Sequence, residues 1–304
     1  MVMKVIYIND LNNLGKYKEL TLCLGFFDAL HKGHLSLIDK AKEFDLPIGV
    51  LTFSASPRTL LQNKEEEVIN SIKMKEKILD NIGVEYLFIL NLSWDILKMD
   101  KDVFINKILK GLNAKNIICG FDYSFGFKGR GKPIDLINAN LFKVFIIPPV
   151  VNKNNEKISS TLIHKLIKEG KIEEANSYLT RPYTIEGYVA HGLKNGRTIN
   201  YRTANIELNE NFSMPKNGVY ATKVIIDNKS YFSMTNVGVH PTINRLDHPL
   251  IETYIFDFDN DIYLHNVTLE FYKYVRDEKK FDSIEELKKQ LKEDEKIIRN
   301  YFTN

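Results

Sequence analysis

The stretch LGFFDALHKGH, residues 24–34, follows an apolar run and contains an aspartate and two of the seven histidines of the chain. The run itself, LTLCLG at residues 20–25, has the length and composition of a buried parallel strand. The segment that follows, HLSLIDKAKEF at residues 34–44, repeats its apolar residues at helical spacing. We therefore expect a strand that ends at Gly25, a tight turn, and a helix that begins near Gly33.

Further apolar runs of strand length recur through the first half of the chain, at residues 48–53, 86–92, 116–121 and 142–150. Helical stretches separate them, and one of these, residues 101–112, places Val103, Ile108 and Leu109 on an apolar face. An alternation of strands and helices is typical of an α/β fold with an open parallel sheet. The sequence thus predicts a Rossmann-like nucleotide-binding domain over residues 1–180.

After the segment TRPYT, residues 180–184, the pattern changes to short alternating segments separated by turn residues. These segments are residues 184–192, 203–208, 218–227, 230–238, 252–258 and 267–275. Such spacing predicts a six-stranded antiparallel β-barrel within residues 181–304. The tail, residues 281–302, reads as an amphipathic helix that starts with a capping box formed by Ser283 and Glu286.

Composition limits the class of protein. A chain of 304 residues with 44% hydrophobic content exceeds the usual length of one domain, and a formal charge of +3 does not indicate a nucleic-acid coat. Cys23 and Cys119 both lie in apolar runs, and the N-terminus has no signal-peptide pattern. No apolar run reaches the roughly 18 residues needed to cross a bilayer. We expect a cytoplasmic protein without a disulfide framework.

His31 and His34 lie three residues apart where the predicted helix begins. A helix N-terminus at the carboxyl edge of a sheet attracts phosphate, because backbone N–H groups and the positive end of the helix point there. Both imidazoles could donate hydrogen bonds to such an anion and stabilise developing charge. Two alternatives stay open for an isolated H-x-G-H: the histidines cap a turn, or they bind a metal ion.

This stretch resembles the G-x-F-D-G-V-H-x-G-H motif of the bacterial bifunctional riboflavin kinases and FAD synthetases, and the resemblance covers nearly the whole chain. The matching residues are Gly25, Phe27, Asp28, His31, Gly33 and His34. The resemblance implies that the first domain is an FMN adenylyltransferase, a nucleotidyltransferase in which His31 and His34 are catalytic. The other four matching residues would bind ATP.

Three further stretches extend the resemblance in the first domain. ISSTLIHKLI resembles a family motif in which Ser160 and Thr161 would bind ATP phosphates. Without the family, a serine- and threonine-rich segment before a helix is expected to be only a helix N-cap. GFDYSFG resembles a flavin-contacting motif, which makes Asp122 and Phe125 candidate contacts for FMN or adenine. Without the family, an aromatic residue at a strand end is expected to lie in the core. The basic loop at residues 126–132 could clamp phosphate or be a solvated loop.

Two positions depart from the family pattern. His164 stands where the family has an arginine, and a mostly neutral imidazole does not replace a fixed bidentate charge. Ser56 stands where the family has a histidine. These departures support an alternative in which the chain is only a riboflavin kinase and its first domain is impaired or regulatory.

In the second domain, HGLKNGRTINYRTANI at residues 191–206 resembles the riboflavin kinase motif H-G-x-G-x-G-R-T-L-G-F-P-T-A-N-I. The resemblance implies ATP contacts at Gly192, Gly196, Arg197 and Thr198. A threonine and an asparagine two apart on an extended segment put two oxygens on one face, which suits Mg²⁺. Thr203 and Asn205 are therefore the predicted metal ligands, while a hairpin is the plain alternative for the two glycines.

IETYIFDF resembles the family strand whose glutamate acts as base on the 5′-hydroxyl of riboflavin, which makes Glu252 the candidate. Taken alone, Glu252 would be a solvated strand carboxylate. YVRDEKKFDSIEELKKQ matches a family stretch in which Arg276 and Phe281 would line the flavin pocket.

The implied activity is bifunctional flavin biosynthesis: riboflavin and ATP give FMN on the barrel, and FMN and ATP give FAD and pyrophosphate on the α/β domain, both with Mg²⁺. The expected partners are riboflavin, FMN and ATP, with no nucleic acid and no membrane. A different class of protein, an RNA-binding module that uses the barrel as a platform, is disfavoured by the weak charge.

Overall fold

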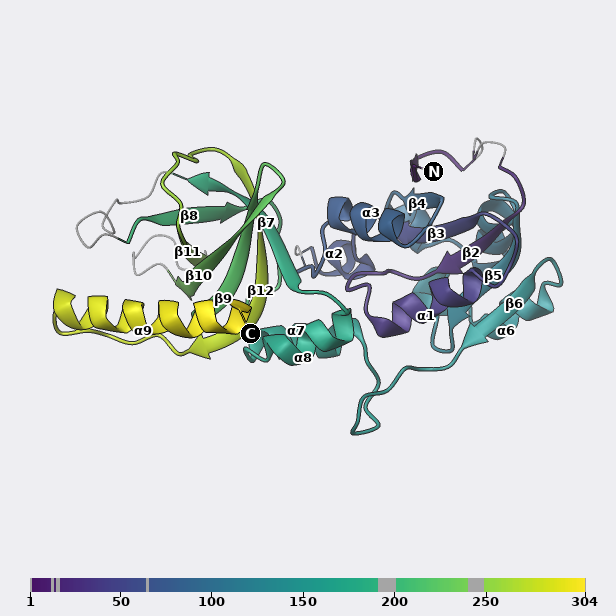
Figure 1. Ribbon diagram of the computed structural model, residues 1–304. Helices are drawn as coiled ribbons and strands as arrows, with labels where there is room; N and C mark the ends of the chain where they lie inside the picture. The colour runs from purple at the N-terminus through teal and green to yellow at the C-terminus, as the bar shows by residue number, and fades with distance from the viewer. Residues whose placement is uncertain are drawn as a thin grey trace. The chain divides into compact units, whose positions relative to one another are not determined.

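The computed structural model describes residues 2–11, 14, 17–63, 66–190, 201–239 and 249–303. The chain divides into two compact units, of which the first comprises Met1–Glu66 and Asn70–Ser159 and the second comprises Glu67–Ile69 and Ser160–Asn304. Figure 1 labels the helices and strands of both units. The predicted functional boundary at residue 180 stays a prediction.

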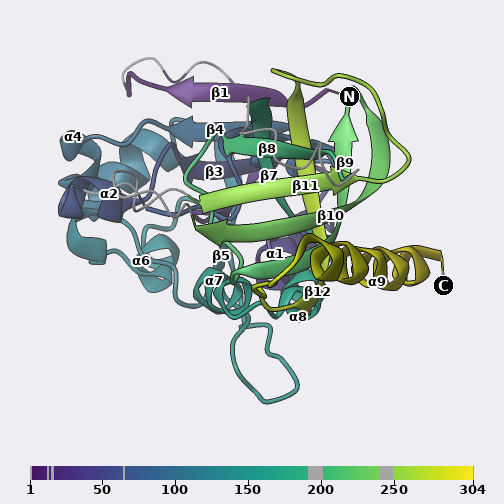
Figure 2. The ribbon, with the colours of Figure 1, turned by 90° about the vertical axis from the view of Figure 1, so that its left-hand side faces the viewer.

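The first unit is built on a six-stranded parallel sheet. Its strands, in spatial order, are β1 (Lys4–Ile8), β4 (Tyr86–Leu90), β3 (Ile48–Phe53), β2 (Leu20–Leu24), β5 (Ala114–Gly120) and β6 (Lys143–Ile147). Each neighbouring pair is parallel, and Figure 2 shows β1 at one edge beside β4. The predicted open parallel sheet is confirmed.

Helical segments connect these strands: α1 (Lys32–Ala41), α2 (Pro57–Gln62), α3 (Ile72–Asn81), α4 (Trp94–Leu97), α5 (Lys101–Val103), η1 (Phe104–Leu109), η2 (Phe127–Gly129) and α6 (Pro133–Asn138). All five residues of β2 are buried, and the strand packs on both faces, with its three leucines in one hydrophobic cluster and Cys23 in the other. Both cysteines are free, and burial raises the pKa of Cys119 to about 12. They are inert core residues of central strands.

The segment predicted as one amphipathic helix over residues 101–112 has a different form. A short α-helix gives way to the π-helix η1, in which the N–H of Lys110 bonds to the carbonyl of Ile105 at 3.0 Å. The wider turn changes the side-chain phase, so that Ile108 and Leu109 are buried as predicted while Val103 is exposed. The expectation that Val103 shares their apolar face is wrong.

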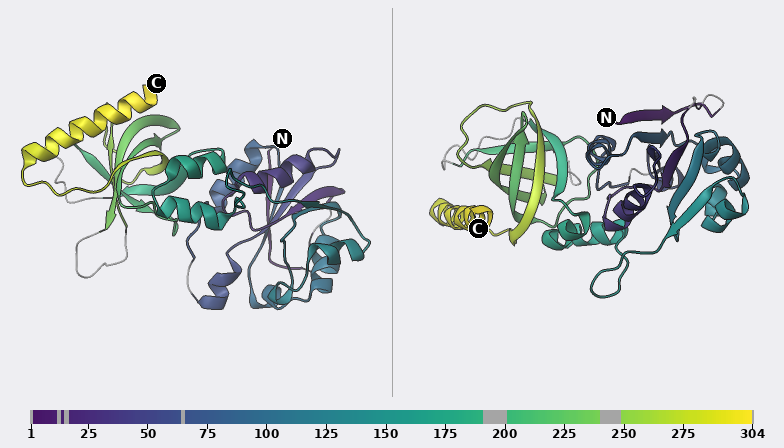
Figure 3. Two further views of the ribbon diagram at one scale, coloured as in Figure 1. Left: turned by 90° about the horizontal axis from the view of Figure 1, so that it is seen from below. Right: turned by 45° about the vertical axis from the view of Figure 1, so that its right-hand side comes forward.

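The second unit contains a closed barrel of six antiparallel strands, as predicted. In spatial order these are β10 (Lys229–Val239), β11 (Pro249–Ile255), β8 (Thr203–Leu208), β7 (Tyr183–Ala190), β12 (Asn266–Arg276) and β9 (Gly218–Ile226). Two helices, α7 (Ser160–Lys168) and α8 (Ile172–Leu179), precede the barrel in the chain and lie side by side (Figure 3). The amide of Asn176 on α8 donates to the carbonyl of Phe271 on β12 at 2.8 Å, so α8 is attached to the barrel wall.

The last helix, α9 (Ile284–Thr303), lies along the outer face of the barrel beside β10 and β12 (Figure 1). Its predicted cap is present, because the hydroxyl of Ser283 accepts from the N–H of Glu286 at 3.2 Å. The carboxylate of Glu286 accepts from Asp282 instead of Ser283, at 3.3 Å. Among the helices of the described residues, none is long and apolar enough to cross a membrane.

Barrel closure depends on a close approach of backbones at Gly187 on β7. A Cβ atom added to Gly187 would lie 2.2 Å from the carbonyl oxygen of Glu207 on β8. We expect Gly187→Ala to lower the free energy of unfolding of the barrel by about 2 to 3 kcal/mol, because the strands must separate locally. Chemical denaturation followed by circular dichroism measures this loss, and a variant as stable as the parent would contradict the close packing.

Candidate functional sites

The topology of the first unit brings two predicted groups of site residues to one edge of the sheet. β2 and β5 are neighbours, but the chain continues from β2 toward β3 on one side and from β5 toward β6 on the other. Strand order therefore reverses between β2 and β5, and open α/β sheets bind ligands at the carboxyl ends of the strands at such a point. The loops that leave these two strands carry residues 25–31 and residues 121–126.

The loop between β2 and α1 is buried and conformationally strained. Phe27 and Leu30 are fully buried and have φ angles of 52° and 47°. A positive φ in a residue other than glycine costs about 1 to 3 kcal/mol, persists where the surroundings enforce it, and is concentrated at functional sites. Gly25 allows the turn to fold onto itself, since an added Cβ would lie 3.0 Å from a ring carbon of Phe27.

His31 and His34 have different environments at the start of α1. His31 is buried and is the N-cap, because its Nδ1 accepts from the N–H of Gly33 at 3.1 Å. When neutral, its ring therefore carries the proton on Nε2. His34 is half-buried and stacks on His31, with ring centroids 3.9 Å apart and 18° between the planes. A metal ion lies in the plane of an imidazole that binds it, so these nearly parallel rings do not converge on one ion.

Three side chains from β3 and the start of α3 hold this loop. The hydroxyl of Thr52 donates to the carbonyl of Phe26 at 2.7 Å, and the amide of Asn70 donates to the carbonyl of Asp28. Lys75 is only 2% exposed, and its Nζ lies 4.5 Å from the centroid of the Phe26 ring. No local pattern points to these contacts, since the partners are distant in sequence. Lys75 adds a buried positive charge beside a loop that is predicted to receive phosphate.

The two predicted flavin contacts in the loop after β5, Asp122 and Phe125, have different surroundings. Asp122 is exposed, and its carboxylate forms an ion pair with Lys157. Phe125 is buried in the core, with its ring centroid 5.2 Å from that of Phe104. A Cβ on Gly131 would lie 2.7 Å from the Phe125 ring. This packing supports the core interpretation of Phe125, and flavin contacts at both residues stay predictions.

The remaining positions of the adenylyltransferase motifs are placed as follows. Ser160 and Thr161 are the first two residues of α7, as predicted, and Thr161 is exposed. His164 is half-buried on the same helix. Ser56 is the N-cap of α2, where its hydroxyl accepts from the N–H of Arg58 at 3.3 Å. The position at which the family has a histidine thus has a helix-capping role here.

A pocket of about 460 Å³ lies in the second unit between the outer face of the barrel and α9. Its lining residues are Tyr201, Thr203, Val219, Met234, Asn236, Glu252, Tyr254, Arg276, Glu278, Lys279, Phe281, Ile284, Leu287 and Leu291. A concave pocket with apolar side chains and a few polar groups is typical of sites for small molecules. Four of the predicted kinase residues, namely Thr203, Glu252, Arg276 and Phe281, therefore come together in one pocket.

Strand pairing places the predicted base and metal ligands on one face of the barrel. Glu252 lies directly opposite Asn205 on β8 and Asn236 on β10. Residues directly opposite each other in antiparallel strands point to the same face. Thr203 shares that face because it is two residues from Asn205, and it lies opposite Tyr254. The pocket thus presents carboxylate, amide and hydroxyl oxygens across three neighbouring strands.

The opposite face of these strands carries a chain of buried hydroxyl groups. Thr222 contacts Ser233 and Thr235 at oxygen–oxygen distances of 2.8 and 2.7 Å, and Thr235 contacts Thr253 at 3.0 Å. All four side chains are fully buried. A one-residue slip of β11 would bury Glu252 in place of Thr253, so this chain of hydroxyls fixes the register that presents Glu252 to the pocket.

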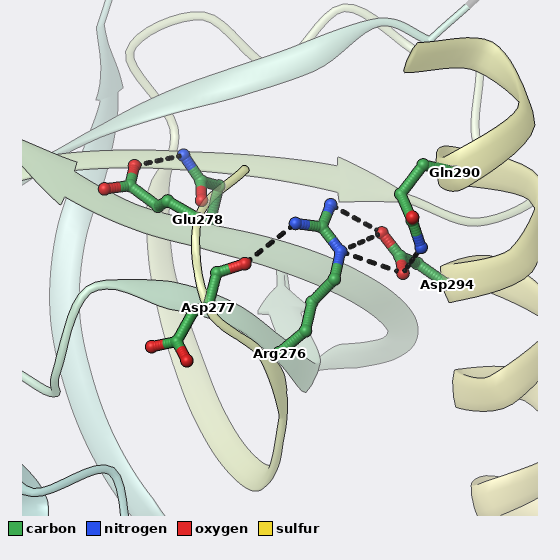
Figure 4. A network of polar contacts seen from close by, with 6 residues as sticks. Arg276, Asp277, Glu278, Gln290 and Asp294 are labelled. Carbon is green, nitrogen blue, oxygen red and sulfur yellow. Dashed lines mark hydrogen bonds and ion pairs between the residues drawn. The ribbon is translucent and has the colours of Figure 1, made fainter. Parts of the chain in front are cut away.

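Arg276 enters the pocket wall at the end of β12, and Figure 4 shows the polar contacts around it. Its guanidinium makes a bidentate pair with Asp294 on α9, with the shortest distance 2.8 Å, and its Nη1 donates to the carbonyl of Asp277 at 2.9 Å. The carbon of the guanidinium lies 6.0 Å from the ring centroid of Phe281. Asp294 was missed by the sequence interpretation, because a charged residue on an amphipathic helix reads as exposed.

A second link between α9 and the pocket wall involves Tyr201. The hydroxyl of Tyr201 lies 3.5 Å from the carboxylate of Glu295, and burial raises the pKa of Tyr201 to about 12.

The predicted ATP contacts of this unit lie outside the described residues; they are Gly192, Gly196, Arg197 and Thr198.

Comparisons with known proteins match both parts of the chain to described families. Residues 179–302 match the family model described as riboflavin kinase, and residues 15–162 match the one described as FAD synthetase. A bifunctional riboflavin kinase/FMN adenylyltransferase from Listeria monocytogenes is 35% identical over 310 residues, which cover 99% of this chain and 98% of the relative. A protein with the same description from Bacillus subtilis is 33% identical over 317 residues, 99% of each chain.

A crystal structure from Streptococcus pneumoniae, described as that of a macrolide-efflux protein, superimposes with a TM-score of 0.91. That protein is 36% identical, and the match covers 97% of this chain and 99% of the other. Together with the two curated relatives, this likeness extends over nearly the whole chain. The chain belongs to the family of bifunctional riboflavin kinases and FMN adenylyltransferases.

Proposed function

We propose that the barrel pocket phosphorylates riboflavin and that the carboxyl edge of β2 and β5 adenylylates the FMN so formed. The observation that carries this proposal is the convergence of Glu252, Thr203, Arg276 and Phe281 on one pocket. Because the chain matches both family models, the alternative of a kinase with a relic first domain is not favoured.

In the kinase reaction, the 5′-hydroxyl oxygen of riboflavin attacks the γ-phosphorus of ATP, and ADP leaves. Glu252 accepts the hydroxyl proton and orients the nucleophile between Asn205 and Asn236. The apolar residues of α9 that line the pocket, Leu287 and Leu291, would cover the flavin ring. Their burial of the ring would exclude water from the reacting atoms.

Thr203 and Asn205 fit a magnesium ion in the chemistry of their donor atoms. A hydroxyl and an amide oxygen on one strand face are hard ligands, and Mg²⁺ typically takes a few protein oxygens together with phosphates and water. When bound, the ion neutralises charge on the phosphates of ATP. Glu252 lies opposite Asn205 on the neighbouring strand, which supports a base close to these two proposed ligands.

In the adenylyl transfer, a phosphate oxygen of FMN attacks the α-phosphorus of ATP, and pyrophosphate leaves. This reaction needs positioning and charge stabilisation more than covalent help from the protein. His34 and the Nε2–H of His31 would donate to phosphate oxygens, and Lys75 would add positive charge behind the loop. Ser160 and Thr161 belong to the second unit, and their proposed contacts to ATP phosphates rest on the family motif alone.

One incubation tests the proposed function. The purified chain is supplied with riboflavin, ATP and Mg²⁺, and riboflavin, FMN and FAD are separated over time. Formation of both FMN and FAD is the expected result. Formation of FMN alone would select the single-activity alternative, and the absence of both products would refute the proposal.

A cytoplasmic location stays a prediction, supported by the two free and buried cysteines.

The kinase activity should be separable from the first unit. We expect a fragment that begins at Ser160 to phosphorylate riboflavin and to lack FMN adenylylation, because α7 and α8 belong to the barrel unit. A fragment that begins at Ser177 cuts α8 and removes Asn176, which bonds to both Phe271 and Tyr183, so it should be less stable. Melting curves and FMN formation for the two fragments check this; a folded but inactive longer fragment would contradict the division of labour.

A further inference from the structure

The guanidinium of Arg276 is held on one side and open on the other. Nε and Nη2 donate to the carboxylate of Asp294, and Nη1 donates to the carbonyl of Asp277 (Figure 4). Within the described residues, these bonds engage three of the five N–H groups of an arginine and leave one on Nη1 and one on Nη2. Asp294 is 0% exposed and also accepts from the amide of Gln290 at 3.0 Å.

We propose that Asp294 is a positioning residue of the riboflavin site. Its two oxygens fix the plane of the Arg276 guanidinium at the pocket wall, since a fork-to-fork pair restricts both distance and orientation. Its negative charge also cancels that of Arg276. The remaining N–H groups then suit an uncharged carbonyl acceptor, such as those of the isoalloxazine ring, better than a phosphate. This inference rests on the proposed kinase function.

Anchoring of α9 alone does not account for this buried pair. A second bidentate pair, Arg299 with Asp257, already ties α9 to the end of β11, with distances of 2.8 and 2.9 Å. The side chain of Asp257 is 76% exposed, and neither residue lines the pocket. Taking two charges out of water carries a desolvation penalty that apolar residues of similar size avoid. The two pairs thus differ in burial and in their relation to the pocket, because the Arg276–Asp294 pair is buried and its arginine lines the pocket.

The test compares Asp294→Asn with the matched control Asp257→Asn. Riboflavin affinity is measured without ATP, by quenching of flavin fluorescence, and the KM values for riboflavin and MgATP are measured separately. We expect Asp294→Asn to weaken riboflavin binding and to raise its KM at least tenfold, with the KM for MgATP and FMN adenylylation unchanged. Asp257→Asn should keep riboflavin affinity within twofold of the parent. Equal riboflavin affinity in parent and Asp294→Asn would overturn the inference.

A second variant keeps the inference testable if Asp294→Asn folds poorly. Arg276→Met combined with Asp294→Leu removes both charges, so it should regain the melting temperature of the parent without regaining riboflavin affinity. Recovered affinity in this double variant would show that the pair only anchors the helix, and it would overturn the proposal. Parent protein that forms no FMN would refute the kinase function itself, so the two failures are distinguishable.

Discussion

Glu252→Gln is expected to slow riboflavin phosphorylation by roughly 10² to 10⁴ and to leave FMN adenylylation unchanged. Glutamine keeps the size of the side chain and its place opposite Asn205 and Asn236, but it cannot accept the proton of the 5′-hydroxyl. The loss should therefore appear in kcat, with little change in the KM for MgATP. Initial rates of FMN formation from riboflavin, and of FAD formation from supplied FMN, measure the two activities in the same preparation.

Glu207→Gln is the matched control for this prediction. Glu207 lies on the neighbouring strand β8 and is exposed, its carboxylate accepts from the hydroxyl of Tyr188, and it does not line the pocket. The same chemical change there should leave kinase turnover near that of the parent. Near-normal turnover in Glu252→Gln would remove Glu252 from the site, and an equal loss of both activities would indicate misfolding.

The parts of the fold that depend on local information could be predicted from the sequence. β2 is read from its apolar run, and α1 from the spacing of its apolar residues, because both patterns reflect burial along a short segment. The start of α9 follows from Ser283 and Glu286, because the hydroxyl of Ser283 accepts from the N–H of Glu286, three residues along the chain. The switch from helix-connected strands to short alternating strands predicts the barrel, since each pattern matches one kind of sheet.

The contacts that complete the sites could not be predicted in this way. Arg276 ends β12, whereas Asp294 lies in the middle of α9, so the two residues are distant in the sequence. Their pairing depends on how α9 lies on the barrel. Lys75 reads as a solvated helix residue, yet the fold buries it against Phe26. The π-helix η1 arises from packing that side-chain periodicity does not report, because it changes the phase of the helix within one turn. Each of these features is set by tertiary contacts and not by neighbours in the chain.

His34→Ala is expected to raise the barrier to FAD formation by about 2 to 4 kcal/mol, comparable to the loss of one oxyanion donor. His34 is half-buried at the start of α1, stacked on His31, at the edge of the sheet where the strand order reverses. Its loss removes a donor to phosphate oxygens and leaves the helix cap in place, because the cap is formed by Nδ1 of His31. Riboflavin phosphorylation should survive. FAD formation from FMN at saturating MgATP, with a melting curve beside it, measures the effect.

His31 allows capping and chemistry to be separated by two substitutions. His31→Ala removes the N-cap acceptor and should cost about 1 kcal/mol of stability as well as activity, whereas His31→Asn restores an oxygen acceptor for the N–H of Gly33. If His31 donates through Nε2, His31→Asn should regain the melting temperature but not the rate of FAD formation. If His31→Asn regains activity as well as stability, the role of His31 is limited to the helix cap. A stable His34→Ala protein that makes FAD at the parent rate would remove this stretch from the adenylyl-transfer site.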